Sequence, residues 1–220
     1  MPAARQPVAQ LLWCATQLSA LMRQSAKPST CAHWRMSCAS RLSAAADNDE
    51  EDEVLIDASM MTLCNFLPDE AATRHWGGLM ARSLQPGLQI QLHGTLGAGK
   101  TTWVRALLRQ LGYTGTVKSP TYGLVEHYLL ELNTHSRIDL YHFDFYRFNR
   151  NEEWLEAGCR DYFRSDSICL VEWPEQAGDL LPAPDLSVSL DYLNQDSESG
   201  RLLEIVAMTD AGKTCLKRLF

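Results

Sequence analysis

Residues 94–101 (GTLGAGKT) match the phosphate-binding pattern G-x-x-x-x-G-K-[ST] at every fixed position. Glycines let the backbone curl until its N–H groups point inward around phosphate oxygens, and a helix that begins at such a loop adds the positive end of its dipole. Lys100 can bring a mobile positive charge to the β- and γ-phosphates, and the hydroxyl of Thr101 can bind Mg²⁺. A chance match to the pattern is expected in about 1% of chains of this length, so the motif predicts a nucleotide-phosphate site.

The segments on either side of this loop have the patterns that the motif requires. Residues 88–93 alternate apolar and polar side chains, which is typical of a strand. Residues 103–111 carry apolar side chains at helical spacing, and Gly112 follows as a helix-terminating residue. The sequence therefore predicts a strand, a phosphate loop and a helix in succession.

Two carboxylates close predicted strands further along the chain. The strand predicted over 137–145 ends in aromatic residues around Asp144, where phosphate-loop proteins place an acid that holds Mg²⁺ or its water. The apolar run 168–171 predicts a strand buried on both faces, and Glu172 follows it. A carboxylate there is costly unless paired or metal-bound, so we interpret Glu172 as a Mg²⁺ ligand or a water-positioning group. The alternative for Asp144 is a turn cap or a partner of Arg147.

Two neighbouring segments allow more than one interpretation. Residues 113–122 contain Gly, Ser and Pro and predict a loop, which either reaches toward the γ-phosphate as in nucleotide switches or serves as an ordinary connector. Trp173 either stacks on the nucleotide or packs in the core.

The remaining elements follow from periodicity and turn residues. We expect a short strand over 62–66 and then a helix that opens at 68–70, with Pro68 in its first turn. Its expected apolar stripe is Ala72, His75, Trp76, Leu79, Met80 and Leu84. The other predicted elements are a hairpin of strands 123–132 and 137–145 with its turn at 133–136, a short helix over 151–158, a strand pair over 187–192 and 201–208, and a helix from Asp210.

Composition places the chain in an ordinary globular class. It has 220 residues, is 45% hydrophobic and 21% charged, and carries a formal net charge of −7, which argues against a large non-specific nucleic-acid surface. No run of 18 apolar residues occurs, so we expect no membrane-spanning helix. The seven cysteines form no C-x-x-C pair, and scattered single cysteines favour a reducing cytoplasm over a disulfide scaffold.

The first 58 residues differ from the rest. No acidic residue occurs before Asp47, whereas residues 47–53 hold six carboxylates in seven positions. Such a self-repelling run predicts a boundary, with a disordered N-terminal extension over 1–58 and a single domain over 59–220. The extension is interpreted as an upstream addition, and an organelle transit peptide is the alternative.

The combination of motifs resembles the TsaE (YjeE) family, the small ATPase of bacterial tRNA threonylcarbamoyladenosine biosynthesis. The motifs stand in family order over about residues 62–215: GTLGAGKTT at 94–102, VKSPTY at 117–122, HFD at 142–144 with YR at 146–147, GCRDYF at 158–163, and LVEWP at 170–174. The resemblance implies a single P-loop NTPase domain of the α/β class, with a mixed, mostly parallel sheet flanked by helices.

The resemblance also implies roles for individual residues. Lys100, Asp144 and Glu172 would be needed for hydrolysis, with Thr101 and Glu172 as the ligands of Mg²⁺. Residues 119–121 would form the switch-like loop. The residues predicted to bind ATP are Glu70, Gly97, Ala98, Gly99, Lys100, Thr101, Thr102, Asp144, Trp173, Glu175 and Arg201.

The partners implied by the resemblance are TsaD-like and TsaB-like subunits. These place the threonylcarbamoyl group on adenosine 37 of tRNA, so tRNA is reached only through the complex, and the ATPase resets that complex between turnovers. The leader before residue 60 has no family counterpart, and the segment 126–136 is longer than usual.

Two other classes of function compete with this interpretation. A small-molecule kinase would use Arg147, Arg150, Arg160 and Arg164 as a cationic cover over transferring phosphates. A GTPase-like binding module would carry the guanine-reading N-K-x-D pattern, which does not occur in the chain.

Overall fold

The structure is a computed structural model that describes residues 61–131, 137–195 and 198–219. Residues 58–220 form one compact unit. The expected disordered extension over 1–58 and the hairpin turn at 133–136 lie outside the described residues. Within the described part of the chain, no helix has both the length and the apolar character needed to cross a membrane.

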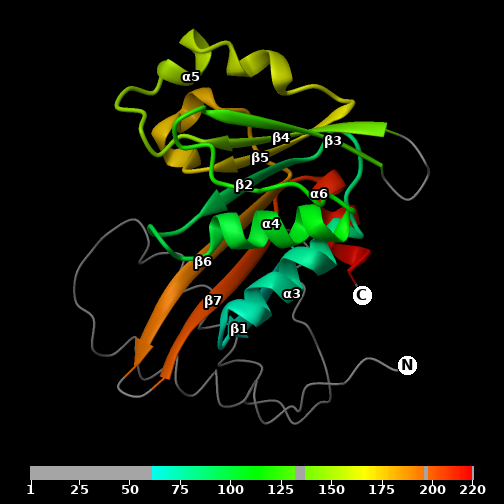
Figure 1. The fold of residues 1–220 in the computed structure, drawn as a ribbon, viewed down its shortest axis with the longest axis vertical. Coiled ribbons are helices and arrows are strands. Elements are labelled where there is room, and N and C mark those ends of the chain that lie inside the picture. Colours follow the sequence, from blue (N-terminus) through cyan, green and yellow to red (C-terminus); the bar gives the residue numbers. More distant parts are fainter. Residues whose placement is uncertain (1–60, 132–136, 196–197, 220) are drawn as a thin grey trace. The chain divides into compact units, whose positions relative to one another are not determined.

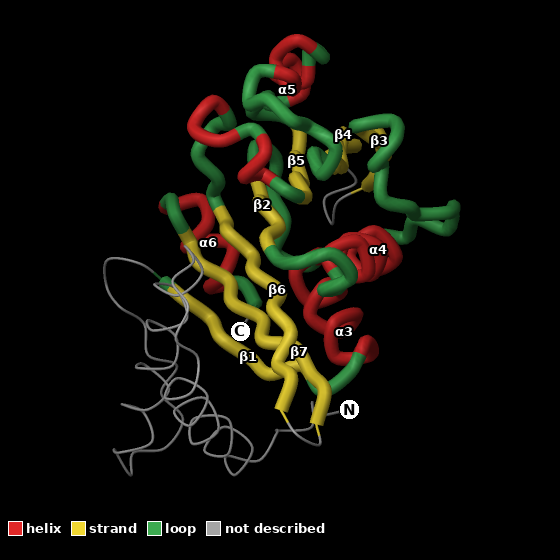
Figure 2. The backbone as a smooth tube through the Cα atoms, turned by 90° about the vertical axis from the view of Figure 1, so that its left-hand side faces the viewer, coloured by secondary structure: helices red, strands yellow, loops and turns green. Residues whose placement is uncertain are grey.

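A seven-stranded sheet organises the unit, with strand order β1-β7-β6-β2-β5-β4-β3 (Figures 1 and 2). Its strands are β1 (Thr62–Leu67), β2 (Gln89–His93), β3 (Val125–Glu131), β4 (Arg137–Asp144), β5 (Ser167–Glu172), β6 (Leu186–Gln195) and β7 (Glu198–Ala207). The pairings β6–β2, β2–β5 and β5–β4 are parallel, and the pairings β1–β7, β7–β6 and β4–β3 are antiparallel. The predicted mixed sheet is confirmed. The parallel pairings are three of six rather than a majority, because β7 and β1 on one side of the parallel strands and β3 on the other are joined by antiparallel pairings.

Four α-helices and three short 3-10 turns complete the described unit. The α-helices are α3 (Glu70–Ala81), α4 (Lys100–Gln110), α5 (Glu153–Glu156) and α6 (Asp210–Lys217). The 3-10 turns are η1 (Cys159–Tyr162), η2 (Pro174–Gln176) and η3 (Gly178–Leu180). The predicted helix over 151–158 is therefore reduced to the single turn of α5. Gly158 lies between α5 and η1 in a left-handed conformation.

Two clusters of buried side chains cover the two faces of the sheet. The larger cluster joins α3, α4 and α6 to strand residues such as Ile90, Leu140 and Leu170. The smaller cluster is rich in aromatic side chains and joins Phe143 and Val171 to Trp154 of α5. Every residue of β5 is buried, as its apolar run predicted.

Helix α3 packs on α4 (Figure 1). Most of the expected apolar stripe faces the core, since Met80 and Leu84 are buried in the larger cluster and Ala72 and Trp76 pack against it. Its buried residues are Thr73, Gly77, Met80 and Ala81, and His75 is exposed. A Cβ atom at Gly77 would lie 2.4 Å from the carbonyl oxygen of Trp103 in α4. The helices thus approach closely at a glycine, which an apolar stripe does not reveal. The helix begins at Glu70, within the predicted opening at 68–70. Pro68 lies before the helix rather than in its first turn, because Asp69 is the cap and accepts a hydrogen bond from the backbone N–H of Ala72.

Candidate nucleotide-binding site

The loop between β2 and α4 has backbone conformations that require glycine. Gly94 has a φ of 127°, and a Cβ atom there would lie 2.1 Å from the carbonyl oxygen of Leu190 in β6. Gly99 caps α4 with a φ of 111°. The backbone N–H of Ala98 donates to the carbonyl oxygen of Thr95 at 3.1 Å. The loop therefore lies tightly against β6 in a shape that side chains at these glycines would prevent.

Lys100, the first residue of α4, is folded back over this loop. Its Nζ donates to the carbonyl oxygens of Gly94 at 2.6 Å and Thr95 at 3.0 Å, and it lies 4.0 Å from the ring centre of Trp173. Burial lowers the pKa of Lys100, and the nearby carboxylate of Glu172 opposes that shift. The ammonium group is thus held among acceptors that a phosphate can replace.

Thr101 and Glu172 join the loop to the end of β5. The Thr101 hydroxyl donates to Oε1 of Glu172 at 2.8 Å. The same carboxylate oxygen lies 2.9 Å from Nε2 of His142 in β4. Glu172 and His142 are both buried. The two residues predicted to bind Mg²⁺, which lie 71 positions apart in the chain, are therefore in direct contact.

Asp144, at the end of β4, binds the loop predicted to be switch-like. Its Oδ2 accepts hydrogen bonds from the hydroxyl of Ser119 and, at 2.7 Å, from that of Thr121. Its Oδ1 accepts the backbone N–H of Tyr146 at 2.9 Å. Asp144 also pairs with Glu172 in the parallel register of β4 and β5, so the two carboxylates end neighbouring strands. Asp144 therefore caps a turn, as one alternative proposed, and also tethers the loop at residues 119–121.

Trp173 and Glu175 border the site on the side of β2. Trp173 has a φ of 60°, a left-handed conformation that is uncommon for a bulky residue, and its ring lies 4.9 Å from that of Tyr146. The carboxylate of Glu175 lies 3.6 Å from Nδ1 of His93. Burial would raise the pKa of Glu175, but the nearby imidazole of His93 and the charge of Lys100 outweigh that effect, so the pKa is lowered.

Arg201 of β7 lies beside Gly99 of the loop. A Cβ atom at Gly99 would lie 3.5 Å from the Arg201 Nε and 3.4 Å from Thr73 of α3. The guanidinium lies 5.3 Å from the ring centre of Tyr192, whose hydroxyl donates to the carbonyl oxygen of Gly97 at 2.6 Å. The Nε atom of Arg201 is buried and has no partner among the described residues. A buried donor without an acceptor beside this loop suits an anionic ligand.

The side chains of two residues predicted to bind ATP form no hydrogen bond or ion pair with the other site residues that the structure describes. Glu70 is exposed in the first turn of α3 and forms an ion pair with Arg74 at 2.5 Å. Thr102 follows Thr101 on α4 and is partly exposed.

The donor set fits a magnesium–nucleotide complex. Among the described residues, no group of three or more His, Cys, Asp or Glu side chains is arranged to bind a metal unaided. Mg²⁺ is usually held by one or two carboxylates together with phosphate oxygens and water. Thr101 and Glu172 supply such a partial set, and Lys100 and Arg201 lie where they can meet phosphate charge.

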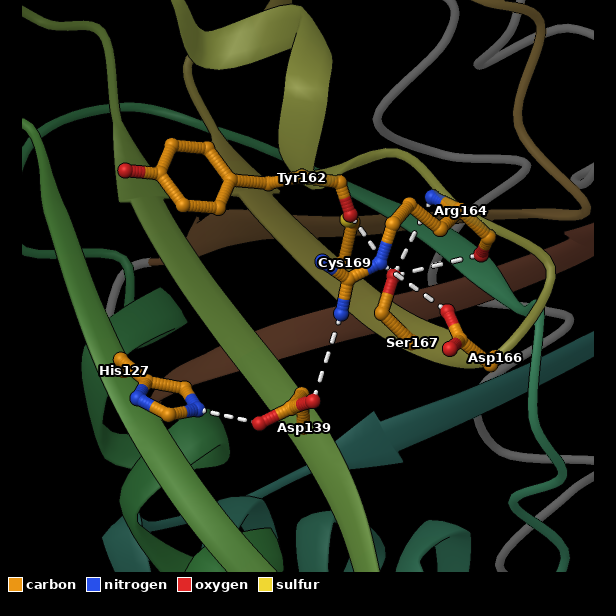
Figure 3. A network of polar contacts seen from close by, with 7 residues as sticks. All are labelled: His127, Asp139, Tyr162, Arg164, Asp166, Ser167 and Cys169. Atoms are coloured by element: carbon orange, nitrogen blue, oxygen red, sulfur yellow. Dashed lines mark hydrogen bonds and ion pairs between the residues drawn. The ribbon is translucent and has the colours of Figure 1, made fainter.

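Two of the four arginines expected of a kinase, Arg150 and Arg164, are engaged elsewhere. Arg164 pairs with Asp166 at 3.0 Å and with Asp139 at 3.3 Å (Figure 3). Asp139 pairs in register with Ser167, so this network lies at the opposite end of β4 and β5 from Asp144 and Glu172. Arg150 is bound to Glu156 on the exposed surface at 2.8 Å. These two side chains do not cover the candidate site in this structure.

Several contributors were missed by sequence reasoning. His142 stands in a recognised motif and continues the alternation of its strand, but its contact with Glu172 depends on the neighbouring strand. No sequence pattern identifies Tyr192 or His93 as part of the site. Their contacts, with Gly97 and Glu175 respectively, join segments that are distant in sequence.

Comparison with known families decides the relationship. A family model described as "Threonylcarbamoyl adenosine biosynthesis protein TsaE" matches residues 67–203, a range that contains every predicted site residue. The chain belongs to the TsaE family. The resemblance inferred from the motifs is thereby confirmed.

Relatives of known name support this membership in TsaE. The tRNA threonylcarbamoyladenosine biosynthesis protein TsaE of Haemophilus influenzae is 40% identical over 162 residues, covering 71% of this chain and 97% of that protein. The protein of the same name from Bacillus subtilis is 33% identical over 129 residues, covering 59% of this chain and 76% of that protein. The crystal structure of Bacillus subtilis YdiB superposes with a TM-score of 0.59 at 26% identity and covers 74% of this chain and 97% of its own.

Proposed function

We propose that this chain is a Mg²⁺-dependent ATPase that supports N6-threonylcarbamoyladenosine modification of tRNA. The observation that carries the proposal is the hydrogen bond between Thr101 and Glu172 at 2.8 Å, which joins the phosphate-loop motif to the carboxylate at the end of β5. The names of the TsaE relatives supply the pathway.

The chain's own groups would divide the work between binding and hydrolysis. Backbone N–H groups of residues 97–102 and the ammonium of Lys100 would bind the phosphates, with Arg201 adding a second positive charge. Thr101 and Glu172 would hold Mg²⁺, which when bound neutralises charge on phosphate oxygens. Oδ2 of Asp144 accepts hydrogen bonds from two hydroxyl groups here, and the same carboxylate would accept a proton of the attacking water.

We further propose that the chain acts with TsaD-like and TsaB-like subunits in the cytoplasm. Hydrolysis would serve their turnover, and the chain would not itself transfer the threonylcarbamoyl group. Contact with tRNA would then be indirect, in keeping with the net charge of −7.

The decisive experiment follows the γ-phosphate of labelled ATP. The full chain should release inorganic phosphate when Mg²⁺ is present, at a rate that rises when the TsaD-like and TsaB-like subunits are added. Transfer of the label to a small metabolite would instead indicate a kinase and overturn the proposal. Depletion of the protein should also lower threonylcarbamoyladenosine in bulk tRNA, measured by mass spectrometry.

A further inference from the structure

His142 is a buried imidazole on the face of β4 that packs toward α4. Its side chain is fully buried, and it continues a row that begins with Ile138 and Leu140 of the larger cluster and ends with Asp144. Of the histidines in the described ranges, His142 alone is buried. An apolar side chain would fill this position without burying two polar nitrogens.

The two ring nitrogens of this imidazole differ in their hydrogen bonding. Nε2 lies 2.9 Å from Oε1 of Glu172, whereas Nδ1 is buried and has no partner among the described residues. An ionised carboxylate can only accept, so the proton belongs on Nε2 and the imidazole donates to Glu172. Within the described part of the chain, the ring is therefore oriented by this one hydrogen bond.

The same carboxylate oxygen has a second donor, the hydroxyl of Thr101 at 2.8 Å. The donors come from β4 and α4, on two sides of Glu172. Two directed hydrogen bonds on one oxygen restrict rotation of the carboxylate plane, in the way that outer partners orient a metal-binding group.

From this geometry we propose that His142 is a positioning residue, which fixes the carboxylate of Glu172 in the orientation needed to receive Mg²⁺ with the nucleotide. The inference rests on the proposed function, because it assigns Glu172 to Mg²⁺. It adds a role for a fully buried side chain whose hydrogen bond is to Glu172.

The test separates hydrogen bonding from packing. His142→Phe keeps a planar ring but removes the donor, whereas His142→Gln places an amide donor near the position of Nε2. Binding of a fluorescent ATP analogue to the full chain is measured in EDTA and across a Mg²⁺ titration, with thermal unfolding recorded for each variant. His127→Phe is the matched control, because it removes a 2.6 Å contact between an imidazole and Asp139 at the far end of the strands (Figure 3).

We expect His142→Phe to raise the half-saturating Mg²⁺ concentration by about tenfold or more, and to change nucleotide affinity in EDTA by less than about twofold. His142→Gln should restore the half-saturating concentration to within about threefold of wild type, and His127→Phe should leave it unchanged. If His142→Phe does not fold, His142→Asn replaces it, since the shorter amide cannot reach Glu172 and should behave as Phe does.

Either of two results would overturn the inference alone, and a third would overturn the proposed function with it. An unchanged Mg²⁺ requirement in His142→Phe, or Gln as impaired as Phe or Asn, would mean that the imidazole only fills space, while the proposed function would stand. A wild-type chain whose nucleotide binding ignored Mg²⁺ would overturn the proposed function as well, so the two failures are distinguishable.

Discussion

At the scale of single residues, the candidate site holds a buried ammonium group against carbonyl oxygens and an aromatic ring. Lys100 is 4% exposed and keeps its ammonium group bound to two loop carbonyls above the Trp173 ring. Its pKa is lowered by burial, and nearby carboxylates, Glu172 first among them, work against that shift. A triphosphate that displaced the carbonyls would give this ammonium a stronger partner, because charge-assisted bonds are the stronger ones.

Lys100→Ala tests the cation. We expect ATP affinity to fall at least tenfold and phosphate release by about 10²–10³-fold, because backbone amides alone cannot balance a triphosphate. Calorimetry and a phosphate-release assay measure the two effects. Lys213→Ala, which removes an exposed ion pair with Asp210 at 3.2 Å, should change neither. Wild-type turnover in Lys100→Ala would show that the site is misassigned.

Glu172→Ala tests the carboxylate at the end of β5. Nucleotide binding without Mg²⁺ should stay within a few-fold of wild type, because the phosphate-binding groups remain. Mg²⁺-dependent hydrolysis should drop by about 10²–10³-fold, measured by phosphate release across a Mg²⁺ titration. The control is Glu156→Ala, which removes a surface carboxylate paired with Arg150. Hydrolysis that kept its Mg²⁺ dependence in Glu172→Ala would remove this residue from the metal site.

At the scale of elements, the loop before α4 depends on its contact with β6. Gly94 lies so close to Leu190 that no side chain fits, and Tyr192 of the same strand binds the carbonyl oxygen of Gly97 at 2.6 Å. Strand β6 thus supports the loop at two points, although its own sequence carries no nucleotide motif.

Gly94→Ala should therefore disturb both folding and binding. The clash with Leu190 adds to the cost of a positive φ, so we expect a loss of more than about 2 kcal/mol in the free energy of unfolding. Gly112→Ala is the matched control, because Gly112 has a φ of 86° but no atom within 4 Å of an added Cβ, and it should cost about 1 kcal/mol and leave ATP binding intact. Urea unfolding measures the free energy of unfolding of both variants, and calorimetry measures their ATP affinity. Equal losses in both variants would show that contact with β6 is unimportant.

At the scale of the whole described unit, the site lies where the central parallel strands end. Asp144 and Glu172 terminate β4 and β5, and His93 terminates β2. Ligands of open α/β sheets bind at the carboxyl ends of such strands. The antiparallel strand pair β6–β7 then brings Tyr192 and Arg201 to the same region from the neighbouring side.

Removal of residues 1–58 should leave this unit folded and able to bind ATP. The sheet, both buried clusters and all predicted nucleotide ligands lie within residues 61–219. Thermal unfolding and nucleotide titration of the shortened chain measure the outcome. A clear fall in melting temperature would contradict the division at residue 58.

Much of this architecture was predictable because it is local in sequence. The phosphate loop is defined by eight consecutive residues, and β5 is defined by a continuous apolar run. Strands β1 and β2 and the helix after the loop follow from spacings of two and about 3.6 residues. These signals act on residues that are neighbours in the sequence: a glycine permits a tight turn, a cap begins a helix, and alternating side chains favour a strand. They can therefore be recognised without knowledge of the tertiary structure.

The contacts that join these pieces were decided only by tertiary structure. Periodicity marks an apolar face but does not say which strand lies beside it, so neither the bond from Tyr192 to the loop nor the His142–Glu172 contact was predictable. The close approach of α3 to α4 at Gly77 likewise depends on two helices meeting. The amino-acid sequence alone therefore determined the phosphate-loop motif and the elements around it. The strand order, which pairs residues far apart in the chain, determined which side chains hold that chemistry in place.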